Sequence, residues 1–123
     1  MVALRCLIVD DNAGLVTAAR DLLEREGITV VGAAATASEA VRRFQELRPD
    51  VTLVDIDLGV ESGFDVAREL ATDANGAPAF IILISTHAEA DYIEFIEASP
   101  AIGFVAKTDL SSDVIREILR RAA

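Results

Sequence analysis

Five short apolar runs, rich in β-branched residues, recur along this chain at nearly constant intervals. They begin near Leu4, Ile28, Val51, Phe80 and Ile102, so successive starts lie 24, 23, 29 and 22 residues apart. Each interval has room for one helix and two loops, an alternation that is typical of a parallel sheet. The runs are apolar throughout, as expected of strands that helices cover on both faces. The sequence therefore predicts an α/β fold of (βα)5 type.

Helix start and stop signals fill the intervals between these runs. Leu15, Ala19 and Leu22 recur at i, i+4 and i+7 and predict the inward face of the first helix, which Gly27 would end. Pro49 stands where the second helix would end. Residues 36–39, Thr-Ala-Ser-Glu, form a capping box that opens the second helix. Residues 73–78, Asp-Ala-Asn-Gly-Ala-Pro, are typical of a loop and explain the longer third interval. The remaining helices are predicted over residues 63–71, 88–97 and 111–121.

Composition limits the classes of protein to which the chain can belong. Its 123 residues fit one domain, residues 1–123, that can bury a core without disulfides or structural metals. Eleven basic against 21 acidic residues give a net charge of −10, which argues against direct nucleic-acid binding. The single cysteine, Cys6, lies inside the first apolar run and is expected to be a buried thiol. With no apolar stretch near the roughly 20 residues of a spanning helix and no signal-peptide pattern, we expect a cytoplasmic protein without membrane association.

Charged residues stand at the carboxyl ends of three of the apolar runs. Asp10 and Asp11 follow the first run, Asp55 closes the third, and Lys107 follows the fifth. In an open parallel sheet these ends share one edge, which is where ligands bind. Three carboxylates in a low-dielectric cleft need a counter-charge, and Mg²⁺ takes carboxylate ligands while it also reaches a phosphate group. The pattern predicts a site for a divalent cation and a phosphoryl group, although Asp10-Asp11-Asn12 taken alone is read more simply as a helix cap.

The chain resembles the receiver domains of two-component response regulators over essentially its whole length. Five segments carry the resemblance in order and at compatible spacing: Val9-Asp10-Asp11, Leu53-Val54-Asp55-Ile56, Gly63, Ile84-Ser85 and Phe104-Val105-Ala106-Lys107. Each segment is a weak motif by itself, and the five together are a strong one. The resemblance implies a doubly wound, flavodoxin-like parallel sheet of strand order 2-1-3-4-5. It also implies a signalling domain rather than a turnover enzyme.

The same resemblance implies roles for the charged residues at the sheet edge. Asp55 is the expected phosphoacceptor, which takes its phosphoryl group from the phosphohistidine of a sensor histidine kinase or a phosphotransfer protein. Mg²⁺, or Mn²⁺ in its place, is expected to be held by Asp10, Asp11, Asp55 and the backbone carbonyl of Asp57. Lys107 is expected to contact a phosphoryl oxygen.

Ser85 and Phe104 are expected to transmit phosphorylation to the surface. In the family, the hydroxyl group at the position of Ser85 binds the phosphoryl group, and the aromatic ring at the position of Phe104 moves into the space that is left. Such a change biases an existing two-state equilibrium. The fourth helix, fifth strand and fifth helix would form the partner or homodimer surface. Simpler interpretations stay open, with Ser85 as a helix N-cap and Phe104 as ordinary core packing.

Asp57 and His87 stand two residues beyond Asp55 and Ser85, respectively. Alternation along an extended segment sends the side chains of Asp55 and Asp57 the same way. We hypothesise that Asp57 and His87 approach each other over the acyl phosphate and tune the access of water. Two independent solvated side chains are the alternative. Thr86, next to Ser85, leaves the register of the hydroxyl position open.

Three other positions depart from the family pattern. Gly59 and Thr108 replace prolines that usually follow the phosphoacceptor and the lysine, and Ser62 replaces an acidic residue. These changes concern loop conformation and the partner surface more than the chemistry of the site.

Two other functions are alternatives to a receiver domain that accepts phosphate: a phosphatase and a pseudo-receiver. Haloacid-dehalogenase-type phosphatases also place an Asp two residues after an Asp nucleophile, as in Asp55-Ile56-Asp57, but on the first strand of a larger domain. A pseudo-receiver would share the fold without accepting phosphate, and the set of Asp11, Asp55, Ser85 and Lys107 argues against it. The sequence does not decide between a stand-alone regulator and a receiver that belongs to a longer transcription regulator.

Overall fold

The computed structural model describes residues 3–72 and 79–122. Five parallel strands form the main sheet in the order β2-β1-β3-β6-β7. They are β1 (Arg5–Val9), β2 (Thr29–Ala34), β3 (Val51–Asp55), β6 (Ile81–Ser85) and β7 (Gly103–Ala106). Since β4 (Asp57–Leu58) and β5 (Glu61–Ser62) form a separate antiparallel pair, this order is the predicted 2-1-3-4-5, which is confirmed.

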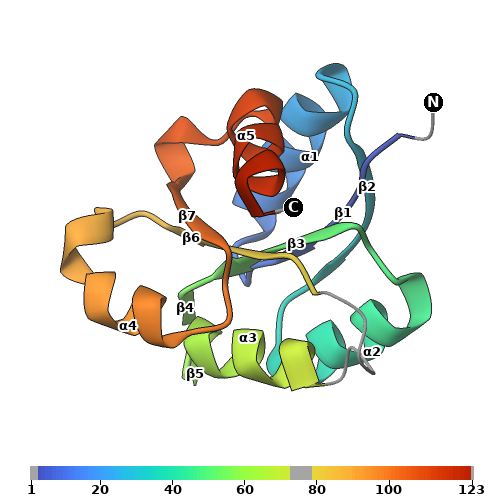
Figure 1. Cartoon of the computed structure of the whole chain (residues 1–123). Helices are drawn as coiled ribbons and strands as arrows, with labels where there is room; N and C mark the ends of the chain where they lie inside the picture. The colour runs from blue at the N-terminus through green and yellow to red at the C-terminus, as the bar shows by residue number, and fades with distance from the viewer. Residues whose placement is uncertain (1–2, 73–78, 123) are drawn as a thin grey trace.

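Helices cover both faces of the sheet, with α1 and α5 on one side and α2, α3 and α4 on the other (Figure 1). Their bounds are α1 (Ala13–Arg25), α2 (Ala37–Leu47), α3 (Gly63–Thr72), α4 (Ile93–Ala98) and α5 (Ser112–Ala122). Two short 3₁₀ turns, η1 (Glu89–Asp91) and η2 (Lys107–Asp109), follow β6 and β7. None of the helices in these described ranges is long and apolar enough to cross a membrane.

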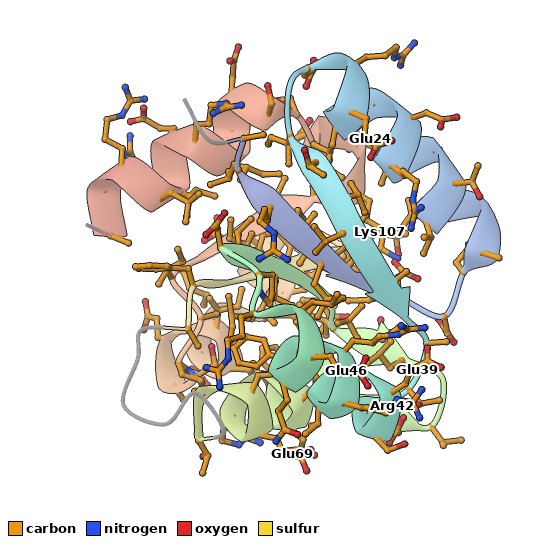
Figure 2. The ribbon with its side chains drawn as sticks, turned by 90° about the vertical axis from the view of Figure 1, so that its right-hand side faces the viewer. Glu24, Glu39, Arg42, Glu46, Glu69 and Lys107 are labelled. Atoms are coloured by element: carbon orange, nitrogen blue, oxygen red, sulfur yellow. The ribbon has the colours of Figure 1, made fainter. Side chains whose placement is uncertain are left out.

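The helix boundaries follow the signals in the sequence. Thr36 Oγ1 accepts a hydrogen bond from Glu39 N at 3.2 Å, and Glu39 Oε1 accepts one from Ala35 N at 2.9 Å. The predicted capping box is therefore present, although the glutamate reaches one residue further back than the standard motif. Gly27 follows α1 with a φ of 93°, a conformation that glycine adopts without strain. Charged side chains, among them Glu39, Arg42 and Glu46, mark the outer side of α2 (Figure 2).

The central strands alternate between two hydrophobic cores. Leu7 and Val54 pack into the core beneath α2 and α3, while Ile8 and Leu53 pack into the core beneath α1 and α5. All four are fully buried, which explains why the strands read as continuous apolar runs. Cys6 lies in the second core, and burial raises the pKa of its thiol to about 12. The predicted buried thiol is confirmed.

The structure corrects three details of the sequence prediction. The fourth helix, predicted over 88–97, is divided into η1 and α4 because the N–H groups of Asp91 and Tyr92 bond three residues back. The hairpin of β4 and β5 was not predicted, since two-residue strands carry no periodic signal. The inward face of α1 was predicted to use Leu22, yet Leu23 is the fully buried leucine. The loop predicted at residues 73–78 lies outside the described residues.

Candidate functional site

The carboxyl ends of β1, β3 and β7 bring the predicted charged residues to one edge of the sheet. Asp55 is the last residue of β3, and β3 pairs directly with β1 and β6. Asp10 and Asp11 follow β1, and Lys107 opens η2 directly after β7. The carboxylate oxygens of Asp10, Asp11 and Asp55 lie within 4.8 Å of one another. The acidic residues and the lysine therefore share one rim of the molecule.

Lys107 bridges two of these carboxylates. Its Nζ lies 2.8 Å from Asp10 Oδ2 and 3.1 Å from Asp55 Oδ2, and the three side chains are at most 11% exposed. Backbone N–H groups hold the other oxygens, since Asn12 N donates to Asp10 Oδ1 at 2.8 Å and Asp57 N donates to Asp55 Oδ1 at 3.1 Å. Each carboxylate is thereby fixed by the turn that follows its own strand. Asp11 is exposed at the mouth of the site.

Burial and like charge raise the proton affinity of the Asp55 carboxylate. Burial raises its pKa most and the neighbouring charge of Asp10 raises it further, whereas the Asp57 N–H and Lys107 lower it, with a net pKa of about 6. For Lys107, burial lowers the pKa, but the hydrogen bonds and charges of Asp10 and Asp55 outweigh burial and the pKa is raised. The site therefore groups three acidic side chains around one lysine.

The residues present fit a hard divalent cation. Asp10 Oδ2 is buried, and the Lys107 ammonium lies 2.8 Å from it. Together with Asp11 and Asp55 it gives an all-oxygen donor set, which suits Mg²⁺. Asp11, exposed beside it, leaves one side of the site open to solvent.

Two glycines lie in close contact with residues of the charged cluster. A Cβ at Gly63 would lie 2.0 Å from the carbonyl oxygen of Asp55, so only glycine fits against the end of β3. The N–H of Gly63 donates to Ile56 O at 2.7 Å and holds α3 to this strand end. Gly59 has a φ of 60°, which a proline ring cannot adopt, and a Cβ there would lie 3.3 Å from Asp11 Oδ2. The departure from proline at Gly59 thus has a conformational cause.

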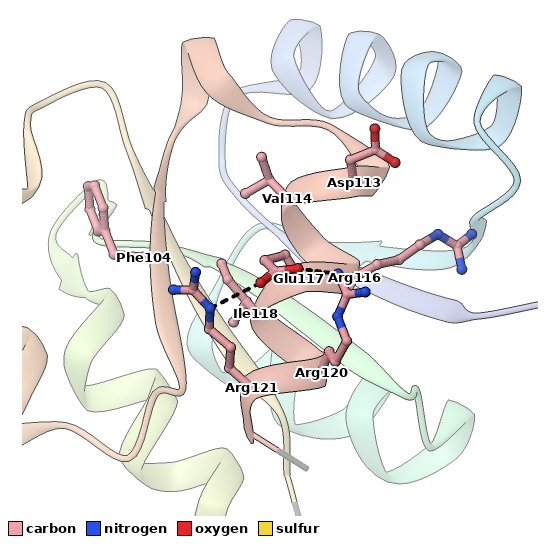
Figure 3. A pocket seen from close by; sticks show the side chains of 8 residues that line it. All are labelled: Phe104, Asp113, Val114, Arg116, Glu117, Ile118, Arg120 and Arg121. Atoms are coloured by element: carbon pink, nitrogen blue, oxygen red, sulfur yellow. Dashed lines mark hydrogen bonds and ion pairs between the residues drawn. The ribbon is translucent and has the colours of Figure 1, made fainter.

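Ser85 and Phe104 occupy different environments. Ser85 ends β6, is fully buried and accepts a hydrogen bond from His87 N at 3.0 Å. It therefore closes a turn and does not cap α4, which begins at Ile93. Phe104 is half-buried on β7, projects away from α5 (Figure 3), and borders the hollow that α5 lines with Val114 and Ile118. Phe104 packs against the core beneath α2 and α3 and is partly exposed at the surface.

Asp57 and His87 lie close together above the strand ends. Asp57 Oδ2 is 4.0 Å from His87 Nδ1, and both side chains are more than half exposed. Thr86 Oγ1 lies 3.5 Å from the same ring nitrogen. The hypothesis missed Tyr92, whose ring meets His87 edge-on at 6.0 Å. Partial burial and the charges of Asp57 and Asp91 raise the pKa of Tyr92, and nothing in its local sequence marked it.

The chain is similar to known receiver domain proteins over most of its length. A model of the response regulator receiver domain matches residues 6–120. The chemotaxis protein CheY of Thermotoga maritima is 32% identical over 93% of each chain. The uncharacterized transcriptional regulatory protein YvfU of Bacillus subtilis is 33% identical over 95% of this chain, which spans 60% of the length of YvfU.

Solved structures agree with these relatives. The signal receiver domain of a modulated diguanylate cyclase from Desulfovibrio desulfuricans G20 superposes with a TM-score of 0.80 at 30% identity, over 98% of this chain and 94% of that one. The receiver domain of the putative regulator NarL from Mycobacterium tuberculosis gives a TM-score of 0.83 at 24% identity, over 99% and 98%, which supports the fold alone. The predicted resemblance is confirmed, and the chain belongs to the receiver domain family of two-component response regulators.

Proposed function

We propose that Asp55 is the residue that accepts the phosphoryl group in this receiver domain. The observation that carries the proposal is the ammonium of Lys107, 3.1 Å from a buried Asp55 carboxylate that closes a parallel strand. A carboxylate is a competent nucleophile, and phosphoryl transfer requires mainly alignment and charge neutralisation. An Asp55 oxygen forms the new O–P bond, and the imidazole nitrogen of a phosphohistidine keeps the electron pair of the broken P–N bond.

The acidic cluster is the proposed cation site. Asp10, Asp11, Asp55 and the backbone carbonyl of Asp57 would hold Mg²⁺, with Mn²⁺ as an alternative of similar ligand preference. Such an ion would neutralise phosphoryl oxygens during transfer. Its support in this chain is the grouping of the three carboxylates, whose oxygen atoms lie within 4.8 Å of one another.

Lys107 and Ser85 are proposed to bind the transferred group. Lys107 would move one of its two contacts from Asp55 to a phosphoryl oxygen, because esterification removes negative charge from Asp55 and adds it to the phosphoryl oxygens. Ser85 would exchange its bond with His87 N for a bond to another oxygen, which draws the turn after β6 toward the site. Phe104 would follow from its half-buried position, altering the surface of α4, β7 and α5 that we assign to partners and to a homodimer.

Asp57, His87 and Thr86 are proposed to regulate loss of the phosphoryl group. The Asp57 and His87 side chains form a 4.0 Å pair, and the backbone N–H of Asp57 donates to the reactive carboxylate. Asp57→Ala and His87→Ala are each expected to change the rate of autodephosphorylation, measured by loss of labelled protein. Unchanged rates in both variants would remove this role.

The proposed partner is a sensor histidine kinase or a phosphotransfer protein, and the 123 residues would act as one receiver domain in the cytoplasm. The domain is modified once per signal rather than turning over a substrate. A phosphatase of the haloacid-dehalogenase type is not favoured, because residues 6–120 match the receiver domain and the Asp57 side chain is 65% exposed. A pseudo-receiver is not favoured either, since Asp10, Asp11, Asp55 and Lys107 form one connected cluster.

Intact-mass analysis tests the assignment directly. The protein is incubated with Mg²⁺ and acetyl phosphate or phosphoramidate, and one added phosphoryl group is expected. Asp55→Asn should abolish the added mass, whereas the matched variant Asp57→Asn should keep it, because its backbone N–H and carbonyl are unchanged. Labelling that persists in Asp55→Asn would place the acceptor elsewhere.

A further inference from the structure

A groove of about 440 Å³ lies between α3 and α4, next to the hairpin of β4 and β5 and outside the cluster of charged residues at the strand ends. Figure 1 shows α3 and α4 on the same side of the sheet, with β4 and β5 beside them. Apolar side chains from four segments line it: Ile56, Val60, Phe64, Tyr92, Phe95 and Ala98. The groove therefore joins parts of the chain that are far apart in the sequence.

Large apolar surface is left uncovered along this groove. Val60 is fully exposed at the tip of the hairpin, and Phe95 is 61% exposed on α4. The Phe95 ring centroid lies 5.6 Å from that of Phe64, which in turn lies 6.2 Å from that of Tyr92. Exposed aromatic and aliphatic groups gathered in a hollow are typical of an interaction site, whereas scattered single ones are not.

The charge around the groove is mainly negative. Asp57 and Glu61 line it, and Asp91 is exposed one residue before Tyr92. Arg68 also lines it, but its guanidinium is paired with Asp65 on the same helix. Residues 49–106 contain eleven Asp and Glu and a single Arg or Lys, which is Arg68. An occupant of this groove must therefore carry positive charge around an apolar centre.

We propose that the groove between α3 and α4 binds a cationic amphipathic helix of a partner protein. An apolar side chain of that helix would pack between Phe64 and Phe95, and Lys or Arg side chains would meet Asp57, Glu61 and Asp91. A helix laid between two helices buries its apolar face in the manner of other helix-in-groove complexes. The site lies on the α3 side of α4, away from the hollow that Phe104 and α5 form.

The test uses a labelled synthetic peptide of about 14 residues, with Leu at helical i, i+3, i+4 and i+7 positions and Lys elsewhere. Its binding to the full chain is followed by fluorescence anisotropy. Phe95→Ala removes an aromatic side chain that lines the groove, and Asp91→Lys reverses the charge of the residue next to Tyr92; each is expected to weaken binding about tenfold. Glu46→Lys, which makes the same charge change on the outer side of α2 (Figure 2), should stay within about twofold.

Three controls distinguish helix binding in the groove from general charge attraction, from dimerisation and from loss of folding. A peptide of the same composition in a non-amphipathic order should bind at least about tenfold more weakly, and circular dichroism should show that the variants are folded. Equal binding of both peptides, or equal loss in Glu46→Lys and Asp91→Lys, would mean general attraction to a protein of charge −10 and would overturn the proposal. Dimerisation that Phe95→Ala abolishes, without peptide binding, would assign the groove to a second copy and would also overturn it.

Discussion

Replacing Asp55 by Asn is expected to stabilise the metal-free protein at neutral pH. The structure buries this carboxylate next to Asp10 and raises its pKa from 3.8 to about 6. A raised pKa means that the folded protein holds the proton more tightly than the unfolded chain, so the ionised group costs stability. A difference of about 2 units at about 1.36 kcal/mol per unit gives about 3 kcal/mol. Asparagine removes that cost and keeps the oxygen that accepts the Asp57 N–H.

The sign of the pH dependence distinguishes this cause from a change in packing. The cost is absent below the unfolded pKa of 3.8, grows as the pH rises toward about 6, and is constant above it. Urea unfolding in EDTA should therefore show the variant more stable by about 3 kcal/mol at pH 8 and by about half of that at pH 5. Mg²⁺ should reduce or reverse this difference in the free energy of unfolding between the variant and the wild type, because a bound cation stabilises the ionised wild-type site.

Asp57→Asn is the matched control, since its side chain is 65% exposed, and its effect should stay within about 0.5 kcal/mol at both pH values. An Asp55→Asn variant that is no more stable than the wild type at pH 8 would refute the reasoning. A difference of equal size at pH 5 and pH 8 would refute it as well, because the gain would then not come from the carboxylate charge.

Other changes probe the supports of the site and the core. Gly63→Ala should lower the free energy of unfolding by about 3 kcal/mol or more and abolish phosphorylation of Asp55, because the added Cβ would lie 2.0 Å from a backbone oxygen. Gly14→Ala should be tolerated, because its nearest contact would be 3.4 Å. Urea unfolding measures the stability of both variants, and intact mass measures their phosphorylation. Glu26→Ala should lower the free energy of unfolding by about 1 kcal/mol, since this side chain accepts the first N–H of α5 at 2.7 Å; no loss would show that the cap contributes nothing. Cys6 should react with a thiol reagent only at the rate of unfolding, because burial raises its pKa to about 12; fast labelling of the native protein would contradict that burial.

The charged edge could be predicted because parallel strands have a fixed polarity. Asp10, Asp55 and Lys107 each follow an apolar run, and the carboxyl ends of such runs meet wherever the strands fold into one sheet. The approach of Asp57 to His87 could also be predicted, because each residue stands two positions beyond a residue at the end of a strand. The division of the fourth helix could not be predicted. Apolar periodicity indicates that a helix exists, but not whether the N–H groups of its first turn bond to carbonyls three or four residues back.

The sequence by itself determined the alternation of the five main strands with helices, the burial of those strands on both faces and the residues at the sheet edge, because periodicity and strand polarity are local properties. Only the tertiary structure decided which side chain contacts which, such as the sharing of Lys107 between Asp10 and Asp55. It also decided the groove in which Phe64 of α3 meets Phe95 of α4. Contacts of this kind depend on the distance and rotation between elements, which the packing of the whole core sets and no single segment encodes.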